Sequence, residues 1–277
     1  MSTESLPDRS AIERFYARDP AIVLDDPDLA RWHEEFLLAL EEGILRAAWR
    51  HPDGAWAAVP WVKKALLIGF SASTTEEIPG WSASAFDRTA FPPRRFLAED
   101  RVRLVPGGSA VRRGAHLAPG VIVMPPAYVN VGAYVGSGTM IDSHALVGSC
   151  AQIGQHVHLS AGAQIGGVLE PALATPVVVE DEAFIGGLAG LFEGVVVRRR
   201  AVVAPGVIIS GSTTIYDLVR GRSLAREVPE GAVVVPGSRP ARGRFAASHS
   251  LSLSVPCIVK YRDDRTAAAT ALEEALR

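Results

Sequence analysis

The sequence predicts a mainly β protein built around a left-handed parallel β-helix, with a helical domain before it and a capping segment after it. Two observations predict this fold. Aliphatic side chains recur at every sixth position through the middle of the chain, a period typical of coils made of three short strands. Aromatic residues make up only 7% of the chain, against 26 glycines and 19 prolines, so the core must be aliphatic and interrupted by frequent turns.

The six-residue repeat runs without exception from Val111 to Ile165 and resumes, after a break, from Val179 to Ile215. A period of six fits neither an amphipathic helix nor a two-sided strand, whereas it places one inward residue on each side of a three-sided coil. Small or β-branched residues four positions further on fill the remaining interior. The repeat positions are Val111, Leu117, Val123, Val129, Val135, Ile141, Val147, Ile153, Leu159, Ile165, Val179, Ile185, Leu191, Val197, Val203, Ile209 and Ile215.

Stacked coils of this kind pair strand on strand about 4.8 Å apart and bury a continuous aliphatic column. Glycine directly follows many inward residues, as at Gly136, Gly148, Gly154, Gly166 and Gly186. We expect glycine there because the turns require backbone angles that other residues avoid.

The repeat predicts a solenoid over residues 101–235, interrupted by a loop at residues 166–176. Ile165 and Val179 are fourteen residues apart (179 − 165), so the segment between them leaves the regular coil. Loops that stand out from a rigid scaffold often carry function, and a tolerated insertion is the alternative interpretation.

Residues 1–100 are expected to form a small helical domain. The segment 27–50 places apolar side chains on one face at helical spacing, with Asp26 as a plausible N-cap and Pro27 at the first helical position. The apolar segment 56–70 fits either a strand or a helix.

Residues 71–98 are rich in serine, proline and charge, which indicates an irregular connection. Residues 236–277 are expected to cap the open end of the solenoid. Within them, residues 250–261 alternate like a strand and residues 266–277 have a helical pattern.

Composition excludes several classes of protein. The formal charge is −2 and the isoelectric point is near 6.4, which argues against a dedicated binder of nucleic acid or of anionic membranes. No apolar stretch is long enough to span a bilayer, and the N-terminus lacks a secretory signal, so we expect a cytoplasmic protein.

Cys150 and Cys257 form no disulfide framework. His158 occupies a different offset of the repeat from His144 and His156, and no acidic residues are evident around these histidines, so no metal site is expected.

Several motifs are more specific than a generic six-residue repeat, and GSCAQIG and GGVLEP are the most specific of them. Together they resemble the family of 2,3,4,5-tetrahydropyridine-2,6-dicarboxylate N-succinyltransferases, over most of the chain. The matching segments are 43–48 and 61–67 in the front domain, 103–106, 128–134, 138–142, 147–154, 157–160 and 165–171 in the solenoid, and 214–217, 228–231 and 257–260 near the end.

This resemblance implies a homotrimer that transfers an acyl group from acyl-CoA to the amine of an amino dicarboxylate, in clefts between neighbouring solenoids. It also implies roles for single residues. Asp142 would bind the substrate amine, and a carboxylate there can also accept the proton that the amine must lose. Arg103 would hold a substrate carboxylate through its planar guanidinium. Ser149, His158, Ser160 and Glu170 lie in matching motifs and are further candidates for substrate binding.

Coenzyme A is expected to lie along the later coils. The backbone at Gly186, Gly187, Ala204 and Gly206 offers a narrow track for its pantetheine arm, and Lys260 is a candidate for its phosphates. The basic run 198–200 is a weaker candidate, since such runs at solenoid corners are more often solvated.

The chain departs from the family pattern after the loop. Where the family reads Gly-Ala-Arg-Ser-Glu, this chain has Gly186-Gly-Leu-Ala-Gly190, so an arginine, a serine and a glutamate thought to share the catalytic work are all replaced. Asp142 is then the one carboxylate expected at the amine, with His144 as a possible partner.

These replacements leave three hypotheses open. Succinyl-CoA is the donor by resemblance to the family. Acetyl-CoA is the alternative, in a specialised pathway like that of tabtoxin biosynthesis, because the pocket has lost groups suited to a charged succinyl tail. The third is a catalytically inactive structural trimer.

Overall fold

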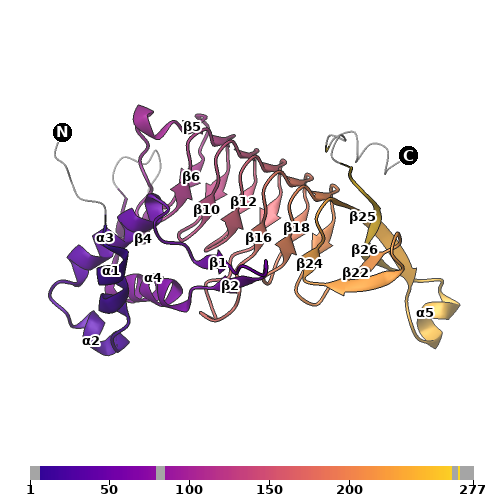
Figure 1. Ribbon diagram of the computed structural model, residues 1–277, viewed down its shortest axis with the longest axis horizontal. Helices are drawn as coiled ribbons and strands as arrows, with labels where there is room; N and C mark the ends of the chain where they lie inside the picture. The colour runs from indigo at the N-terminus through magenta and orange to yellow at the C-terminus, as the bar shows by residue number, and fades with distance from the viewer. Residues whose placement is uncertain (1–6, 79–84, 264–267, 269–277) are drawn as a thin grey trace.

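The computed structural model describes residues 7–78, 85–263 and 268, and its shape is an elongated solenoid with a helical region at one end (Figure 1). The helical region contains α1 (Arg9–Tyr16), α2 (Pro20–Leu24), α3 (Leu29–Glu41) and α4 (Pro60–Ala72). Between α3 and α4 lies a hairpin of β1 (Ala48–Arg50) and β2 (Trp56–Ala58), and a second hairpin joins β3 (Thr75–Glu77) to β4 (Phe86–Arg88). A short 3₁₀ turn, η1 (Ala98–Asp100), precedes the solenoid.

The solenoid is a coil of short strands that enter three sheets in rotation. Pairing between successive coils is parallel and in register, so that Met140 lies between Ile122 and His158. The strands are β5 (Arg103–Leu104), β6 (Ala110–Val111), β7 (His116–Leu117), β8 (Ile122–Val123), β9 (Tyr128–Val129), β10 (Tyr134–Val135), β11 (Met140–Ile141), β12 (Leu146–Val147), β13 (Gln152–Ile153), β14 (His158–Leu159), β15 (Gln164–Ile165), β16 (Val178–Val179), β17 (Phe184–Ile185), β18 (Gly190–Leu191), β19 (Val196–Val197), β20 (Val202–Val203) and β21 (Ile208–Ile209).

Three names distinguish the sheets. The long sheet contains β5, β8, β11, β14, β17 and β20 and continues into C-terminal strands. The β6 sheet contains β6, β9, β12, β15, β18 and β21. The β7 sheet contains β7, β10, β13, β16, β19 and, from the C-terminal segment, β24 (Glu227–Val228). The prediction of a mainly β chain with parallel strands is confirmed.

The aliphatic column forms the core of the solenoid. Every repeat position from Val111 to Ile215 is buried, with no side chain more than 3% exposed. The small residues four positions on are buried with them, including Thr139, whose hydroxyl donates to the Gly154 carbonyl at 2.9 Å. Each coil therefore shields its neighbours' apolar surface, and no coil has a core of its own.

Glycine follows the inward residues for a reason other than the one expected. A Cβ on Gly136 would lie 2.6 Å from the carbonyl carbon of Gly154 on the next coil, and a Cβ on Gly186 would lie 2.4 Å from the Pro205 nitrogen. Close approach between coils, and not backbone conformation, excludes a side chain there. Left-handed backbone occurs two residues later in the corners, as at Gly138 (φ +68°).

The interruption in the repeat lies between the β6 and β7 sheets. A regular step between these sheets takes six residues, so the fourteen from Ile165 to Val179 add eight (14 − 6). The added segment packs against the helical region, where the buried Lys63 donates from Nζ to the Ala174 carbonyl at 2.5 Å. Leu173, at the outside of the loop, is 80% exposed.

The helix expected over residues 27–50 is shorter in the structure. It begins at Leu29, after Asp28 instead of Asp26, and ends at Glu41, where Gly43 adopts a φ of +72° and the Leu45 N–H reaches back to the Ala39 carbonyl at 3.0 Å. Left-handed glycine thus stops the helix in spite of its continuing apolar pattern.

The segments that follow are also more divided than the sequence indicated. Residues 56–70 contain both candidate structures, β2 and then α4, because Pro60 favours the first turn of a helix and not a strand. Residues 71–98, expected to be irregular, include the β3–β4 hairpin.

Helices α3 and α4 pack on the corner between the β6 and β7 sheets. The glycines of that corner admit their side chains: a Cβ on Gly114 would lie 2.8 Å from Leu37, and one on Gly132 would lie 2.9 Å from Leu66. Val131 and Cys150 share the same apolar cluster, and burial raises the pKa of Cys150 to about 12. The helical region is therefore joined to the solenoid by a common core.

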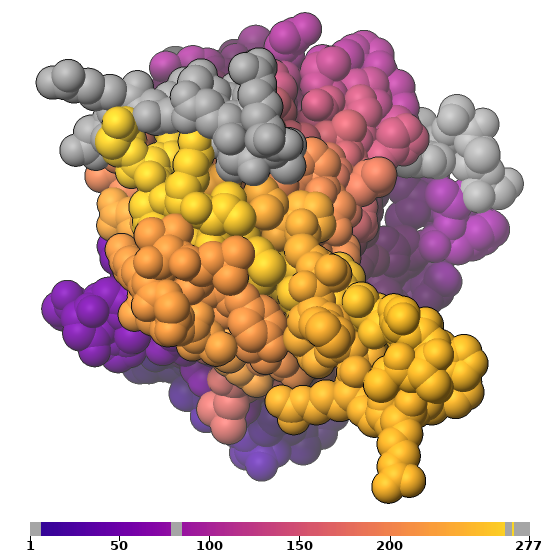
Figure 2. Space-filling model, turned by 90° about the vertical axis from the view of Figure 1, so that its right-hand side faces the viewer, coloured from indigo at the N-terminus to yellow at the C-terminus, as the bar shows by residue number. Residues whose placement is uncertain are grey.

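The C-terminal end is covered by β22 (Thr214–Asp217), β23 (Arg222–Ala225), β24 (Glu227–Val228), β25 (Ala232–Pro240), α5 (Arg244–Ser248) and β26 (Ser252–Tyr261). Figure 2 shows these residues spread over the end of the coil. Asp217 is buried and accepts hydrogen bonds from the Tyr261 hydroxyl at 2.7 Å and from the Arg220 N–H. The strand expected at residues 250–261 corresponds to β26, and the helix expected at residues 266–277 lies outside the described residues.

A pair of alanine substitutions separates the two roles of glycine. Gly206 has a φ of +73° and open space around its Cβ position, so Gly206→Ala should cost about 1–2 kcal/mol of unfolding free energy through strain alone. Gly136→Ala must push two coils apart and should cost more than about 3 kcal/mol. Thermal denaturation compares them, and equal losses would contradict the close-approach argument.

Buried His33 should make the protein less stable in mild acid. Burial lowers its pKa to about 4 in the fold, so only the unfolded chain takes up a proton there between pH 6.5 and pH 4. The free energy of unfolding should therefore fall by about 2 kcal/mol from pH 7.5 to pH 5 through this group. Denaturant titrations of the wild type and His33→Leu measure it, and parallel pH curves would contradict the prediction.

Candidate functional site

The corner between the long sheet and the β6 sheet collects most of the residues singled out from the sequence. It consists of residues 124–127, 142–145, 160–163, 186–189 and 204–207, and we call it the Asp142 edge. Successive corners are joined by backbone hydrogen bonds, such as Leu188 N–H to the Ala161 carbonyl at 3.0 Å. The edge is therefore a straight row whose members are spaced by the stacking of the coils.

Asp142 is the first residue after the inward Ile141, at the point where β11 ends. Its Oδ1 accepts a hydrogen bond from the Ser143 N–H at 2.7 Å, which fixes the carboxylate on the corner. Its Oδ2 lies 3.9 Å from Nε2 of His158, and the side chain is one-third exposed. One oxygen is thus held by the backbone, while the other is available to a bound amine.

His158 lies on the outer face of β14, one coil beyond Met140. Its ring meets the Phe184 ring edge-on, with centroids 5.2 Å apart, and Phe184 stands on the next strand of the sheet. Nε2 is shielded from solvent and has no hydrogen-bond partner among the described residues. A buried, unpaired ring nitrogen beside a carboxylate is suited to bind a polar atom of a ligand.

The sequence left His144 as a partner for Asp142, and the structure places a different histidine beside the carboxylate. His144 occupies the third corner position, with a φ of +62°, and its side chain is exposed. His158 takes the place beside Asp142 because β14 stacks directly on β11.

The later part of the edge is built from small residues. Ser160 lies one coil beyond Asp142, followed by Gly186 and Gly187 and then by Ala204 and Gly206. The space at Gly206 is open, whereas Leu188, 73% exposed, lies over Gly162 of the preceding coil, 2.7 Å from where a Cβ would be. The row offers exposed backbone to an extended ligand, with one apolar side chain standing over it.

Arg103 and Lys260 lie far apart on the long sheet. Arg103 is on β5, two strands before Met140, and its side chain is exposed. Lys260 is on β26 and pairs with Val233 of β25, which pairs in turn with Val202 of β20. Between them, the long sheet flanks the whole Asp142 edge.

Two of the expected residues lie at a different corner. Ser149 and Glu170 belong to the corner between the β6 and β7 sheets, where the Ser149 carbonyl accepts from the Val168 N–H at 3.1 Å. Glu170 lines a cavity of about 1000 Å³ together with Phe192, Glu193 and Arg226. Within one chain, therefore, neither residue is brought to Asp142.

The structure gives a local reason for two of the departures from the family pattern, and nothing in it explains the leucine at position 188. Ala189 points into the core and is fully buried, and Leu188 points outward. A Cβ on Gly190 would lie 2.6 Å from the Phe192 ring and 2.9 Å from Ile208. Phe192 thus occupies the space that a side chain at position 190 requires, a contact that the six-residue pattern did not indicate.

The basic run 198–200 is held by the fold. Arg198 donates to the carboxylates of Glu180 at 3.0 Å and Glu227 at 2.6 Å, and these hydrogen bonds outweigh burial in raising its pKa. Arg199 pairs with Glu182. These side chains anchor corners of the coil and are not free to bind a phosphate as a group.

Two general features bear on function. Within the part of the chain that the structure describes, no group of three or more histidine, cysteine, aspartate or glutamate side chains is arranged to hold a metal ion. Among the same residues no helix is long and apolar enough to cross a membrane.

Comparison with known proteins gives consistent results. Residues 9–72 match the family described as tetrahydrodipicolinate N-succinyltransferase N-terminal. Proteins named 2,3,4,5-tetrahydropyridine-2,6-dicarboxylate N-succinyltransferase are 46% identical over 248 residues in Azoarcus, with 88% of each chain covered, and 42% identical over 270 residues in Afipia carboxidovorans, with 95% covered.

A solved structure from Campylobacter jejuni, named as a 2,3,4,5-tetrahydropyridine-2-carboxylate N-succinyltransferase, is 17% identical. It has a TM-score of 0.48, with 90% of this chain and 64% of that chain covered, and this weak similarity adds nothing to the assignment. The assignment follows from the curated relatives, which match almost end to end at more than 40% identity. This chain belongs to the family of 2,3,4,5-tetrahydropyridine-2,6-dicarboxylate N-succinyltransferases.

Proposed function

We propose that this protein is a coenzyme A-dependent N-acyltransferase. It transfers a succinyl group from succinyl-CoA to the 2-amino group of tetrahydropyridine-2,6-dicarboxylate, in its opened 2-amino-6-oxopimelate form, or of a close analogue. The observation that carries the proposal is the Asp142–His158 pair, in which a fixed carboxylate and an unpaired ring nitrogen lie 3.9 Å apart beside a row of small residues. The names of the relatives supply the substrates.

In the proposed reaction, the substrate ammonium first gives a proton to Oδ2 of Asp142. The freed amine attacks the thioester carbonyl, so that a C–N bond forms and the C–S bond breaks. The nitrogen then loses its second proton, which balances the proton taken up by the departing thiolate to give coenzyme A. Oδ1 stays bound to the Ser143 N–H throughout, which keeps the carboxylate oriented. His158 is placed to bind the substrate next to the reacting amine.

The remaining residues fit binding roles along the edge. Arg103 would pair with a substrate carboxylate and Ser160 would donate a hydrogen bond to the substrate. The backbone from Gly186 to Gly206 would carry the pantetheine arm, with Lys260 near the phosphates. Lys260 lies four strand steps along the long sheet from His158, roughly 19 Å at 4.8 Å a step.

We further propose a left-handed coil, a homotrimer with sites between chains, and a cytoplasmic enzyme. Exposed apolar side chains support the trimer: on the β6 sheet, Tyr128 of β9 is 36% and Ile208 of β21 is 53% exposed, and Leu188 of the edge is 73% exposed. In such a trimer, Ser149 and Glu170 would enter the site as residues of a neighbouring chain.

An acetyl-CoA-dependent reaction is the second candidate. It is favoured by the apolar surroundings of the later coils, where Leu188 is exposed and Phe192 covers Gly190. A succinyl tail carries a carboxylate that these side chains cannot bind, whereas an acetyl group needs no cation.

Replacing the Asp142 carboxylate should abolish most of the activity without loss of fold. Asp142→Asn keeps the oxygen that accepts from Ser143 but cannot take up a proton, so we expect kcat to fall by about a hundred-fold or more. Thiol release from succinyl-CoA with 2-aminopimelate measures it. Full activity of the variant would refute the assigned role, and a wild type inactive with both succinyl-CoA and acetyl-CoA would favour the structural-trimer hypothesis.

The preference of the enzyme for one acyl donor over another should depend on the side chain at position 188. We expect the wild type to prefer succinyl-CoA, and Leu188→Arg to lower KM for succinyl-CoA by about three- to ten-fold through a new ion pair, with acetyl-CoA little affected. Leu97→Arg is the matched control, because it changes another exposed leucine, one that precedes the first strand of the solenoid. A wild type that prefers acetyl-CoA would instead support the second candidate.

A further inference from the structure

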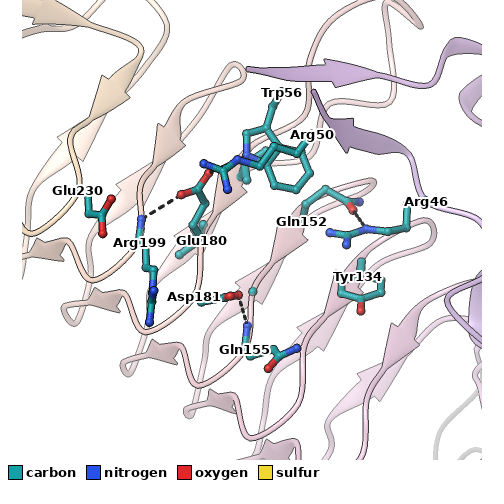
Figure 3. A pocket seen from close by; sticks show the side chains of 13 residues that line it. Arg46, Arg50, Trp56, Tyr134, Gln152, Gln155, Glu180, Asp181, Arg199 and Glu230 are labelled. Carbon is teal, nitrogen blue, oxygen red and sulfur yellow. Dashed lines mark hydrogen bonds and ion pairs between the residues drawn. The ribbon is translucent and has the colours of Figure 1, made fainter. Parts of the chain in front are cut away.

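A second cavity lies on another face of the molecule, between the β1–β2 hairpin and the β7 sheet (Figure 3). Its volume is about 510 Å³, within the range of small-molecule sites. Arg46, Trp56, Tyr134 and Gln152 form its inner wall, and Asp181 lies toward the exposed rim. The Asp142 edge is the corner between the other two sheets, so the two places are separate.

Arg46 has hydrogen-bond donors in this cavity that no side chain or backbone group of the described residues accepts. Its guanidinium carbon lies over the Tyr134 ring, 3.7 Å from the ring centroid, and its Nε donates to Oε1 of Gln152 at 2.9 Å. Gln152 is fully buried and held in turn by donating from Nε2 to the Cys150 carbonyl at 2.9 Å. Among the described residues, neither terminal nitrogen of Arg46 has a hydrogen-bond partner.

The positive charge of Arg46 is not matched by a contacting carboxylate. Burial lowers the pKa of Arg46, and Asp181 acts in the opposite direction from a distance, without an ion pair. The guanidinium is held rigidly by two neutral side chains, with its two free N–H edges in the cavity. This arrangement is suited to bidentate binding of a carboxylate.

Apart from the exposed Glu230, for which no contacting cation occurs among the described residues, the other charges of the wall are already paired. Glu180 accepts from the Trp56 indole at 2.9 Å and from Arg198 at 3.0 Å, and lies 3.4 Å from Arg50. Arg199 pairs with Glu182. Asp181 differs from these groups, since it accepts only the Gln155 N–H, at 2.8 Å through Oδ1, and no cation contacts it among the described residues.

We propose that this cavity binds a free α-amino acid, with its carboxylate on Arg46 and its ammonium on Asp181. A ligand with both charges satisfies the unmatched cation and the unmatched carboxylate together, whereas a simple anion would leave Asp181 repelling it. The side chain of the amino acid would lie against Trp56. The site is distinct from the acyl-transfer site, and binding there does not require that the proposed reaction be correct.

Isothermal titration calorimetry of the full chain tests the proposal with L-leucine, L-glutamate and L-lysine as probes. We expect at least one of them to bind once per chain. The N-acetyl and the amide derivatives of the tightest probe each lack one charge, and each should bind at least about ten-fold more weakly, as the loss of one charge-assisted contact predicts. Inorganic phosphate, as a simple anion, should not compete.

Variants assign the two contacts. Asp181→Asn should weaken binding by at least about ten-fold while keeping the hydrogen bond to Gln155, and Arg46→Lys should weaken it as well because the fork is lost. Asp53→Asn is the matched control, since Asp53 also accepts a backbone N–H through Oδ1, from Ala55, but lies outside the cavity. Asp142→Asn should leave binding unchanged.

Three results would overturn the proposal. The first is the absence of heat with all three amino acids at about 10 mM, roughly ten-thousand-fold above a micromolar Kd. The others are undiminished binding of the N-acetyl derivative, and equal binding by Asp181→Asn and the wild type. The second would indicate a simple carboxylate site. Circular dichroism of each variant checks that a loss of binding does not come from a loss of fold.

Discussion

The close stacking of successive coils is the constraint on which the rest of the molecule depends. Parallel strands about 4.8 Å apart leave no room for a side chain at the start of many corners, so glycine is required at positions such as Gly136 and Gly186. The same spacing brings the inward aliphatic residues into contact and seals the core from water. Any residue on the outer surface is then placed by coil number and corner position, with little freedom to move.

Asp142 and His158 illustrate this placement. The two residues are far apart along the chain, yet they lie 3.9 Å apart because β14 stacks on β11 in register. No loop has to fold over to bring them together. The helical region contributes differently: its hairpin covers the β7 sheet. Two hydrogen bonds hold the hairpin there, one from the Trp56 indole to Glu180 and one from Arg198 to the Gly54 carbonyl.

Much of this arrangement follows from the sequence, because the six-residue period is a direct record of the coil. The buried column from Val111 to Ile215 and the strand at residues 250–261 could be predicted from pattern alone. The contact between Asp142 and His158 could also be predicted from the period, because residue 158 lies one full coil, eighteen residues, beyond residue 140. His144 was the predicted partner instead because it is close to Asp142 in the sequence.

Other features have no signal in the pattern. Arg46 and Gln152 are 106 residues apart and meet only because the hairpin packs on the solenoid. Phe192 follows an inward leucine like any corner residue, and nothing in the period indicates that its ring turns back over Gly190. The end of α3 depended on a single left-handed glycine, Gly43, against an apolar pattern that continued past it.

The regular rise of the coil makes the Asp142 edge a molecular ruler. The separation between Asp142 and the C-terminal strands is a whole number of coils, and each coil consumes about eighteen residues for about 4.8 Å. Insertion at a corner does not adjust that separation gradually: the eight residues added between Ile165 and Val179 leave the coil as a loop, and β16 still pairs in register with β13. Only the addition or loss of a complete coil changes the separation. A change in the length of ligand that the edge can bind must then come from the gain or loss of whole coils, or from side chains such as Leu188 that extend from the edge.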